Sequence, residues 1–373
     1  MKMLTGNPAK YLSIILGIAF AALLISQQAS IFWGLMRLTG SQIRDVQGAE
    51  VWVMDPNVRF VDDIKPVSTN DLQRVRGVRG VDWAVRFYKG LSRARLPDGN
   101  FQQVILLGLD DGSLVGAPQE ILIGSLADLR IPDAIIMDDA GFQQLWPDEP
   151  LAIGKTFEMN DRRAVLVGVC KASRTFQTFP VIYSRYSQAT LFVPPERKIM
   201  SFILLNAQPG VDLADLCKRI REQTGLAALT KQQFIDKTFN FYWDETGIPI
   251  NFGITVILGF IVGTAVSGQT FYLFTIENLK QFGALKAMGT SNLRIAGMVL
   301  SQAMVVGLIG YGLGVGAAGV FGHATRGVTK LAFFMTWEIL VGTGLAVVLM
   351  VVLSSLLCVR RVLVVEPAIV FQS

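Results

Sequence analysis

Charged residues are scarce in this sequence, and four long stretches contain none at all. Asp, Glu, Lys and Arg together make up 17% of the 373 residues, whereas about 25% is usual in soluble proteins. The charge-free stretches cover residues 12–36, 247–276, 295–321 and 339–359. Each is long enough for an α-helix to cross a membrane, which takes roughly 20 mainly apolar residues. The sequence therefore predicts four transmembrane helices, and the absence of charge within them argues against ion-coupled transport.

Histidine is represented by a single residue, which argues against hydrolytic catalysis. Such chemistry needs a positioned base or nucleophile, and His323 lies alone in a short loop beside a span end, where an interfacial position is the more common role. Carboxylates occur as doublets at 62–63, 110–111 and 138–139. Adjacent strand residues point to opposite faces, so such doublets usually mark turns. We expect no enzymatic activity in this chain and no catalytic, metal-binding or cofactor-binding residue.

Cysteine is also rare, with three residues at positions 170, 217 and 358. No C-x-x-C pair and no Cys/His cluster occurs, so the sequence gives no support for structural zinc. Cys358 falls in the fourth span, whereas Cys170 and Cys217 share the long segment between spans one and two. These two residues are compatible with a disulfide in an oxidising compartment, and equally with two reduced, buried thiols.

A phosphate-binding loop of the form G-x-x-x-x-G-K-[ST] is missing, so any ATP-driven work must come from a partner chain. Residues 314–319 match G-x-G-x-x-G, but they lie inside the third span and follow no strand, so their context argues against a dinucleotide site. The same region has glycines spaced four apart, which let helix backbones approach closely in lipid. We expect helix packing, including packing against a second copy of the chain, at Gly310, Gly312, Gly314 and Gly316.

Basic residues flank the predicted spans mainly on one side. They lie before span one, between spans two and three and after span four, at positions 2, 10, 280, 286, 294, 360 and 361. They outnumber Arg326 and Lys330 on the other side, so the positive-inside rule places them in the cytoplasm. A cleaved signal peptide is the alternative for residues 12–36, but this run is longer than the about 7 to 15 residues of a signal core. The formal net charge of +5 forms no basic stripe interleaved with aromatics, so we expect no nucleic-acid binding.

The spans divide the chain into eight predicted segments. These are a cytoplasmic N-terminus with the first span (1–36), an extracytoplasmic domain (37–246), the second span (247–276), a cytoplasmic helix and turn (277–294), the third span (295–321), an extracytoplasmic loop (322–338), the fourth span (339–359) and a cytoplasmic tail (360–373).

The segment 37–246 has a soluble composition and repeats one pattern near both of its ends. Strand-like residues 50–55 are followed by a helix signal at 68–78, and strand-like residues 201–207 by a helical run that Gly225 would end. Two β-α-β units so far apart predict one α+β domain assembled from both ends of the segment. Short apolar runs punctuated by Gly and Pro predict a smaller β-rich lobe inserted at roughly 116–195.

The turn between spans two and three is more ordered in pattern than a simple connector needs to be. Apolar residues recur every third position at Leu279, Phe282, Leu285 and Met288, so the segment can form a short amphipathic helix. Gly289 is well placed to end that helix. Its apolar face can lie in the lipid interface or enter a groove on a soluble partner, and composition does not choose between them.

The same turn carries a resemblance to a known family. Glu277, followed by Gly283, Ala284, Leu285, Lys286, Ala287, Met288 and Gly289, resembles the E-x(n)-G-x-L-[RK]-A-[LM]-G signature of the FtsX-like permeases, the membrane subunits of MacB-type ATP-binding-cassette (ABC) systems. The tail RRVLVVEPAIVF, with Pro367 and Ala368, is similar to the tail of that family. The stretches GIAFAALLISQ, LTKQQFIDK and FYWDETGIPINF resemble its DevC-like branch.

The resemblance implies an inner-membrane permease with a periplasmic domain made of a porter-like lobe and a smaller lobe. It implies a homodimer above two copies of a separate ABC ATPase, which would use ATP and Mg while this chain binds no cofactor. The coupling helix would consist of Glu277, Lys280, Gln281, Phe282, Gly283, Ala284, Leu285, Lys286, Met288 and Gly289.

Two functions are compatible with that assembly. In the first, ATPase closure moves the external domains by mechanotransmission, with a membrane-fusion adaptor and an outer-membrane duct that export a lipid or another amphiphile. In the second, the chain is a regulatory protein that controls a cell-wall hydrolase or a sensor kinase.

Overall fold

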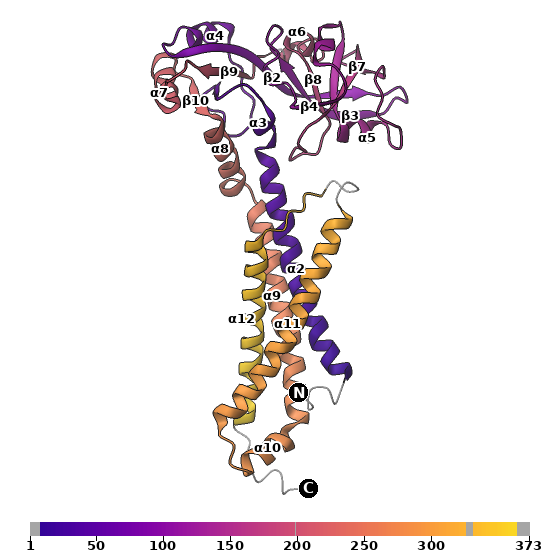
Figure 1. Cartoon of the computed structure of the whole chain (residues 1–373), viewed down its shortest axis with the longest axis vertical. Helices are drawn as coiled ribbons and strands as arrows, with labels where there is room; N and C mark the ends of the chain where they lie inside the picture. The colour runs from indigo at the N-terminus through magenta and orange to yellow at the C-terminus, as the bar shows by residue number, and fades with distance from the viewer. Residues whose placement is uncertain (1–7, 198, 326–330, 364–373) are drawn as a thin grey trace. The chain divides into compact units, whose positions relative to one another are not determined.

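The computed structural model describes residues 8–197, 199–325 and 331–363 of the chain (Figure 1). They form two compact units. One, here called the external unit, is Met36–Thr246, and the other, the membrane unit, combines Met1–Leu35 with Gly247–Ser373.

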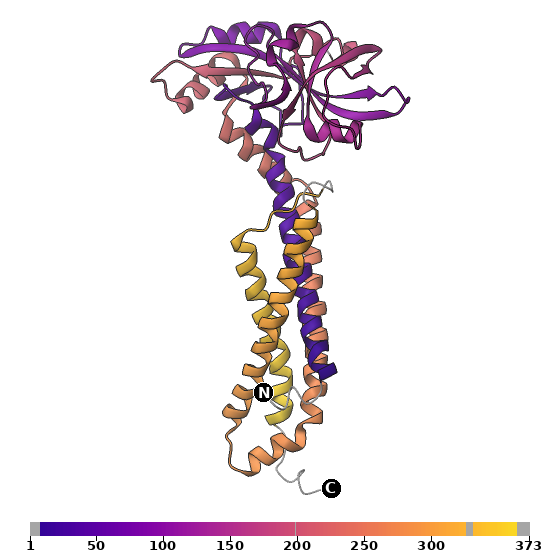
Figure 2. The same cartoon turned by 45° about the vertical axis from the view of Figure 1, so that its right-hand side comes forward.

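The membrane unit contains the four long helices that the sequence predicts. They are α2 (Pro8–Thr39), α9 (Ile248–Glu277), α11 (Asn292–Ala324) and α12 (Trp337–Leu363), and they run side by side in Figures 1 and 2. All four are long and apolar enough to cross a membrane. The apolar window of α2 is 56% buried, compared with 17% for α9. The first helix is therefore the one that the other three cover most.

Small residues allow these helices to pack closely. A Cβ atom at Gly310 of α11 would lie 2.8 Å from Cβ of Ile18 on α2, and one at Gly307 would lie 2.7 Å from Cγ2 of Val351 on α12. The hydroxyl of Ser354 on α12 donates to the carbonyl oxygen of Thr264 on α9 at 3.2 Å. The hydroxyl of Tyr311 on α11 likewise donates to the carbonyl oxygen of Leu340 on α12 at 3.0 Å. Apolar contact and interhelical hydrogen bonds thus join the helices, as is usual within lipid.

The external unit is built on one continuous mixed sheet in the order β10-β1-β9-β2-β3-β8-β5-β7-β4, with β6 paired to both β2 and β7. The strands are β1 (Val51–Met54), β2 (Val81–Arg95), β3 (Phe101–Leu109), β4 (Glu120–Gly124), β5 (Ala134–Asp138), β6 (Thr156–Met159), β7 (Arg162–Lys171), β8 (Val181–Arg185), β9 (Phe202–Ala207) and β10 (Ala227–Thr230). The helices of this unit are α3 (Ser41–Asp45), α4 (Thr69–Arg76), α5 (Asp139–Leu145), α6 (Tyr186–Ala189), α7 (Leu213–Thr224) and α8 (Lys231–Asp244).

The first lobe consists of the two predicted β-α-β units, β1-α4-β2 and β9-α7-β10. Each has a strand of the other between its own strands, which is a split β-α-β arrangement. Local sequence sets the helix ends. Ser68 and Asp71 form a capping box at the start of α4, and Gly225 ends α7 with φ of +74°. The α+β prediction is confirmed.

The second lobe is a closed ring of six strands. β2, β3, β8, β5 and β7 pair in turn, and β6 joins β7 back to β2. We call it the ring lobe. Buried apolar residues between Tyr88 and Val193 in the sequence form its interior, and Phe142 of α5 is one of them. The ring thus includes the second half of β2 and all of β3, residues that precede the insert expected at roughly 116–195. β2 passes from one lobe into the other without a break, so no turn residue marks the change.

The two lobes share a hydrophobic cluster. It combines Trp52 and Phe202 from the first lobe, Ile105 and Tyr183 from outward-facing positions of the ring, and Phe234 of α8. The ring of Trp52 packs edge-on against Phe202, with centroids 5.2 Å apart. Because this cluster is continuous, the two lobes pack as one body.

Candidate functional site

The short helix predicted between spans two and three is α10 (Leu279–Ala287), between α9 and α11. Its end is defined by backbone hydrogen bonds. The amide of Gly289 donates to the carbonyl oxygen of Lys286 at 2.9 Å, and that of Thr290 to Leu285 at 3.1 Å. Gly289 has φ of +87°, which glycine adopts without strain. This is a Schellman motif, and it confirms that Gly289 ends the helix. Ser291 precedes α11 as its N-cap without a side-chain hydrogen bond.

The apolar face of α10 packs on the chain's own α11. Phe282 is only 2% exposed and contacts the cluster of Ile295 and Val299, against which Leu285 is partly buried. Gly283 is buried and Ala284 is half-buried. The sequence offered a lipid interface or a partner's groove for Phe282, and the structure shows a third arrangement. Phe282 therefore holds α10 on the first turns of α11 and is not itself available to a partner.

Two other apolar side chains project from this turn. Met288 is 74% exposed and Leu293 is 85% exposed. Lys280, Gln281 and Arg294 are exposed nearby in the sequence. The predicted coupling residues did not include Leu293 and Arg294, because both were assigned to the flank of the third charge-free stretch. A bulky apolar residue next to arginine directly after a glycine turn was the signal for them. We call Met288, Leu293, Lys280 and Arg294 the turn surface.

The remaining predicted coupling residues have mixed positions. Glu277, at the end of α9, is exposed, and Lys286 is half-buried, and both make contacts within the chain. Lys286 lies in the last turn of α10, where a cation interacts favourably with the helix dipole.

The four glycines predicted for helix packing divide between two faces of α11. Gly310 and Gly314 are buried against α2, where a Cβ at Gly314 would lie 2.7 Å from Cβ of Ala22. Gly312 and Gly316 face open space, with no described atom within 4 Å of an added Cβ. The first pair thus serves packing within the chain, and the second pair leaves a small-residue face uncovered.

Two loops of the external unit make side-chain contacts with α3 and α8, the segments that lead to the membrane helices. The β7–β8 loop contacts α3, which follows α2 in the chain. Both the amide and the hydroxyl of Ser173 donate to the Asp45 carboxylate, at 2.6 and 2.8 Å. The same loop contacts α8, which precedes α9, through Phe176, whose ring centroid lies 4.6 Å from that of Tyr242.

The loop after β1 contacts α8 from the first lobe. Phe60 stacks on Phe241 with centroids 4.1 Å apart, and Lys237 donates to the carbonyl oxygen of Val58 at 2.5 Å. Burial lowers the pKa of Lys237. Sequence patterns did not indicate these contacts, because loop residues have no periodicity from which a partner can be inferred.

The carboxylate doublets occupy turns and strand or helix ends. Asp110 accepts the amides of Gly112 and Ser113 within its own turn. Asp138 is buried and caps α5 through the amide of Gly141 at 3.1 Å. Asp62 forms an ion pair with the buried side chain of Lys89. Each of these carboxylates thus has a structural role.

The two cysteines of the external unit are separate, buried thiols, which decides between the alternatives left open by the sequence. Cys170 belongs to the cluster shared by the lobes, whereas Cys217 lies on the buried face of α7 with Leu216 and Ile220. Burial raises the pKa of both thiols, that of Cys217 to about 11. The side chain of Cys358 lies outside the described residues.

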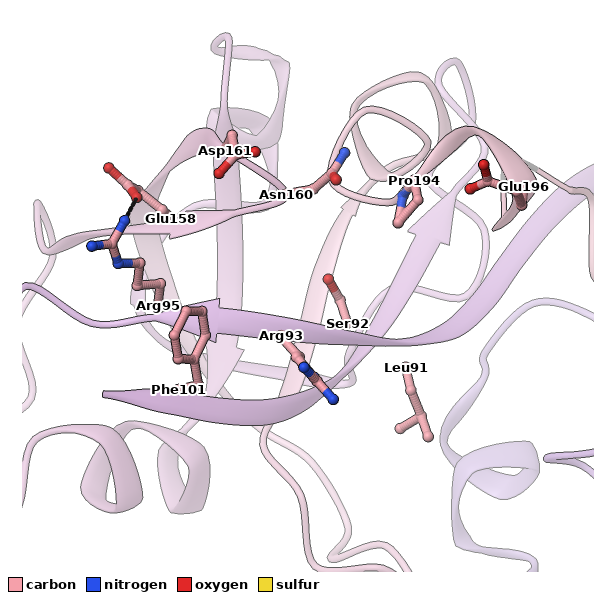
Figure 3. Close-up of a pocket in the computed structure, with 10 residues that line it drawn as sticks. All are labelled: Leu91, Ser92, Arg93, Arg95, Phe101, Glu158, Asn160, Asp161, Pro194 and Glu196. Atoms are coloured by element: carbon pink, nitrogen blue, oxygen red, sulfur yellow. Dashed lines mark hydrogen bonds and ion pairs between the residues drawn. The ribbon is translucent and has the colours of Figure 1, made fainter. Parts of the chain in front are cut away.

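A hollow of about 580 Å³ opens beside β2 in the ring lobe (Figure 3). Its lining carries both signs of charge. Arg93 and Arg95 lie on β2, and Glu158, Asp161 and Glu196 lie across from them. Arg95 pairs with Glu158 at 3.4 Å, and the apolar Phe101 is 68% exposed beside them. Such a mixed lining suits a polar protein segment better than an acyl chain.

Comparisons with known proteins match both parts of the chain. The model of the FtsX-like permease C-terminal domain matches residues 253–367, and the model of the MacB-like periplasmic core domain matches residues 12–223. No curated protein matches the chain.

Solved structures also resemble the chain. The extracellular domain of the noncanonic ABC-type transporter YknZ from Gram-positive bacteria is 14% identical, with 49% of this chain and 98% of that one covered at a TM-score of 0.36. The periplasmic region of MacB from Actinobacillus actinomycetemcomitans is 13% identical, with 53% and 95% covered at a TM-score of 0.37.

Proposed function

The chain belongs to the family of FtsX-like, MacB-type ABC transporter permeases, and from that premise we propose that it is the membrane subunit of an ATP-driven export system. In this proposal the ATPase is a separate chain that binds ATP and Mg, and this chain binds neither. We also propose that a membrane-fusion adaptor and an outer-membrane duct complete the assembly, as the resemblance to DevC-like permeases implies.

The exposed turn surface is the observation that carries this function. Met288 and Leu293 are large apolar side chains with 74% and 85% of their surface exposed, which is the form of an anchor that a partner's pocket covers. Lys280 and Arg294 add positive charge beside them. This combination fits an ATPase groove with an apolar floor and acidic sides. α10 then serves as a coupling helix, and Phe282 holds it in place by packing on α11.

The contacts that the two loops make with α3 and α8 support mechanotransmission. Both segments that join the external unit to membrane helices are held by side chains of that unit, through Asp45 and Ser173 on one and through Phe176 and Tyr242 on the other. A movement of either helix is then passed on to both lobes. The charge-free membrane helices agree with a mechanism in which no polar cargo passes between them.

The uncovered glycines of α11 support a homodimer. Gly312 and Gly316 are spaced four apart and face open space, so a second copy can approach α11 closely at this face. The hollow of the ring lobe supports a protein partner above the membrane, and we assign it to a membrane-fusion adaptor that leads to an outer-membrane duct. The cargo we propose is a lipid or another amphiphile.

The test is affinity purification of the chain from native membranes in mild detergent, followed by identification of the co-purified proteins and an ATPase assay. Recovery of an ATPase together with a fusion-type adaptor supports the exporter. An ATPase recovered with a cell-wall hydrolase or a sensor kinase would favour the regulatory function instead. Purification without any ATPase would contradict both.

A further inference from the structure

The connection between α11 and α12 contains a segment with an unusual surface. Residues 331–336 (LAFFMT) form neither helix nor strand and carry no charge. We call them, together with Trp337 at the start of α12, the strap. Leu331, Phe334 and Trp337 are 41%, 42% and 69% exposed. An aqueous loop of seven residues rarely exposes three large apolar side chains, because such patches mark interaction sites.

The strap is seated on α11 through a glycine. The ring of Phe333 covers Gly322, where an added Cβ would lie 2.8 Å from Cζ of that ring and closer still to two other ring atoms. Phe333 also packs edge-on against Phe321, with centroids 6.2 Å apart. Only glycine leaves room for this ring, so Gly322 fixes where the strap meets α11.

A second glycine seats the strap on α2. A Cβ at Gly34 would lie 2.7 Å from the carbonyl carbon of Ala332 and 3.1 Å from the amide nitrogen of Phe333. The next amide, that of Phe334, donates to the carbonyl oxygen of Ser30 at 3.0 Å. The strap backbone therefore crosses α2 in direct contact, and it ties α2 to α11.

The depth of the strap follows from the length of α2. Gly34 stands 22 residues after Leu12, which lies two residues beyond Lys10, the last charged residue before the first span, and a helix rises about 1.5 Å per residue. The contact at Gly34 is thus about 33 Å along the helix from Leu12, close to the roughly 30 Å thickness of the hydrocarbon layer. Gly322 similarly lies just before His323 and four residues before Arg326, the first charged residue after the third span. Both glycine contacts of the strap therefore lie at the level where α2 and α11 leave the hydrocarbon layer.

We propose that the strap lies in the membrane–water interface on the extracytoplasmic side of the membrane that the four helices cross. Leu331, Phe334 and Trp337 then insert between the lipid headgroups and the upper acyl chains. Aromatic side chains favour that layer. Irregular backbone exposed to lipid is excluded from deeper positions because its amide groups need hydrogen-bond partners. The strap then fixes the depth of the outer end of α2, the helix that continues into the external unit.

The test uses nitroxide labels on the full-length chain, in a Cys358→Ser background because Cys170 and Cys217 are buried. Single cysteines replace Leu331, Phe334 and Trp337 in turn, and the protein is reconstituted into phosphatidylcholine–phosphatidylglycerol vesicles. We expect each label to show a ratio of oxygen to nickel-complex accessibility several-fold above that of a label at Gln102, a partly exposed polar position of the external unit. A ratio equal to that at Gln102 means an aqueous loop and overturns the proposal. Shielding from both reagents means a protein cover and overturns it too.

Paired glycine variants test whether Gly322 positions the strap on α11. Gly322→Val and Gly319→Val alter positions three residues apart on α11, but only the first would collide with Phe333, since nothing described lies within 4 Å of an added Cβ at Gly319. We expect Gly322→Val to change the accessibility ratio of the label at 334 at least two-fold and Gly319→Val to leave it unchanged. The milder Gly322→Ala gives the same comparison if the valine variant does not fold. An unchanged ratio in a folded Gly322 variant would show that the glycine does not seat the strap.

Discussion

Tyr242 of α8 lies against Phe176 of the β7–β8 loop, with ring centroids 4.6 Å apart and planes inclined at 42°. Tyr242 is the last buried residue of the helix that leads to α9, whereas Phe176 belongs to a loop of the ring lobe. Burial raises the pKa of the Tyr242 phenol above its usual range, so the side chain is neutral under all ordinary conditions. The phenol therefore brings no charge into this contact within the ordinary pH range.

Loosening the β7–β8 loop should weaken transmission to the ring lobe. Ser173→Ala removes the hydroxyl bond to Asp45, and hydrogen bonds to charged groups contribute about 1.5–3 kcal/mol. With Phe176→Ala in addition, we expect a broader distribution of distances between spin labels at Gln102 and Gln232 in the presence of ATPase and nucleotide. Ser187→Ala is the control, because Ser187 makes the same pair of bonds to Asp111 away from α3. Equal broadening in the control would remove the loop from the transmission path.

Charges placed on the turn surface should prevent ATPase binding. Met288→Asp with Leu293→Asp replaces two exposed apolar anchors, and the loss of such an anchor typically costs more than about 1–2 kcal/mol of binding free energy. We expect at least a ten-fold weaker affinity for the ATPase, measured by titration in detergent, with no change in thermal stability. Ile131→Asp, at an exposed apolar position of the external unit, is the matched control. Undiminished affinity in the double variant would place the ATPase contact elsewhere.

Phe282→Ala should act differently, because Phe282 is buried against Ile295 and Val299. Truncation of a buried Phe costs about 3–5 kcal/mol, so we expect α10 to separate from α11. Faster amide hydrogen exchange in residues 279–287 would report this directly. ATPase binding should weaken only as a consequence, and a variant with normal exchange but lost binding would mean that Phe282 contacts the partner itself.

Substitution by isoleucine should have different effects on the two glycine faces of α11. Gly314→Ile collides with Ala22 and the backbone of α2, and we expect a melting temperature lower by several degrees. At Gly312 and Gly316 no described atom lies within 4 Å of an added Cβ, so Gly312→Ile and Gly316→Ile should preserve stability while the fraction of dimer falls. Light scattering in detergent measures that fraction. A dimer that survives both substitutions would have its interface on another face.

The buried carboxyl group of Asp138 should make the ring lobe sensitive to pH. Asp138 is 4% exposed, and burial raises its pKa from 3.8 to about 6, although the amides of Val181 and Gly141 donate to it. Because the folded-state pKa is the higher one, the stabilisation is complete below pH 3.8 and is lost as the pH rises through 6. We expect a decrease of about 3 kcal/mol between these limits.

Amide exchange of residues 139–145, followed from pH 4 to 7 after correction for the intrinsic rate, measures this decrease. Asp138→Asn should remove the pH dependence and Asp111→Asn should retain it. A pH dependence that persists in Asp138→Asn would assign it to another group.

Periodicity and turn chemistry were sufficient to predict much of this fold. The four charge-free stretches became helices, Gly225 and Gly289 ended helices as their positions indicated, and the strand–helix patterns at 50–78 and 201–225 formed one lobe. These features are local, so a single sequence contains them.

What the sequence did not indicate depends on contacts between distant segments. The amphipathic pattern of α10 showed which side is apolar, but it could not show that Ile295 covers that side. Glycine spacing marked two faces of α11 without distinguishing the one that contacts α2. β2 (Val81–Arg95) runs through both lobes without a turn, and the four consecutive buried residues at 87–90, where the ring starts, became visible only in the structure.

The continuity of β2 also determines how this protein can be divided. A strand whose first half completes one lobe and whose second half closes a ring cannot be cut without opening both hydrophobic interiors. Neither lobe is therefore an exchangeable module, and a chimaera that transplants the ring alone would inherit an open barrel. The natural cuts lie near residues 36 and 246, where the external unit begins and ends. Recombination between related permeases should accordingly exchange the whole external unit.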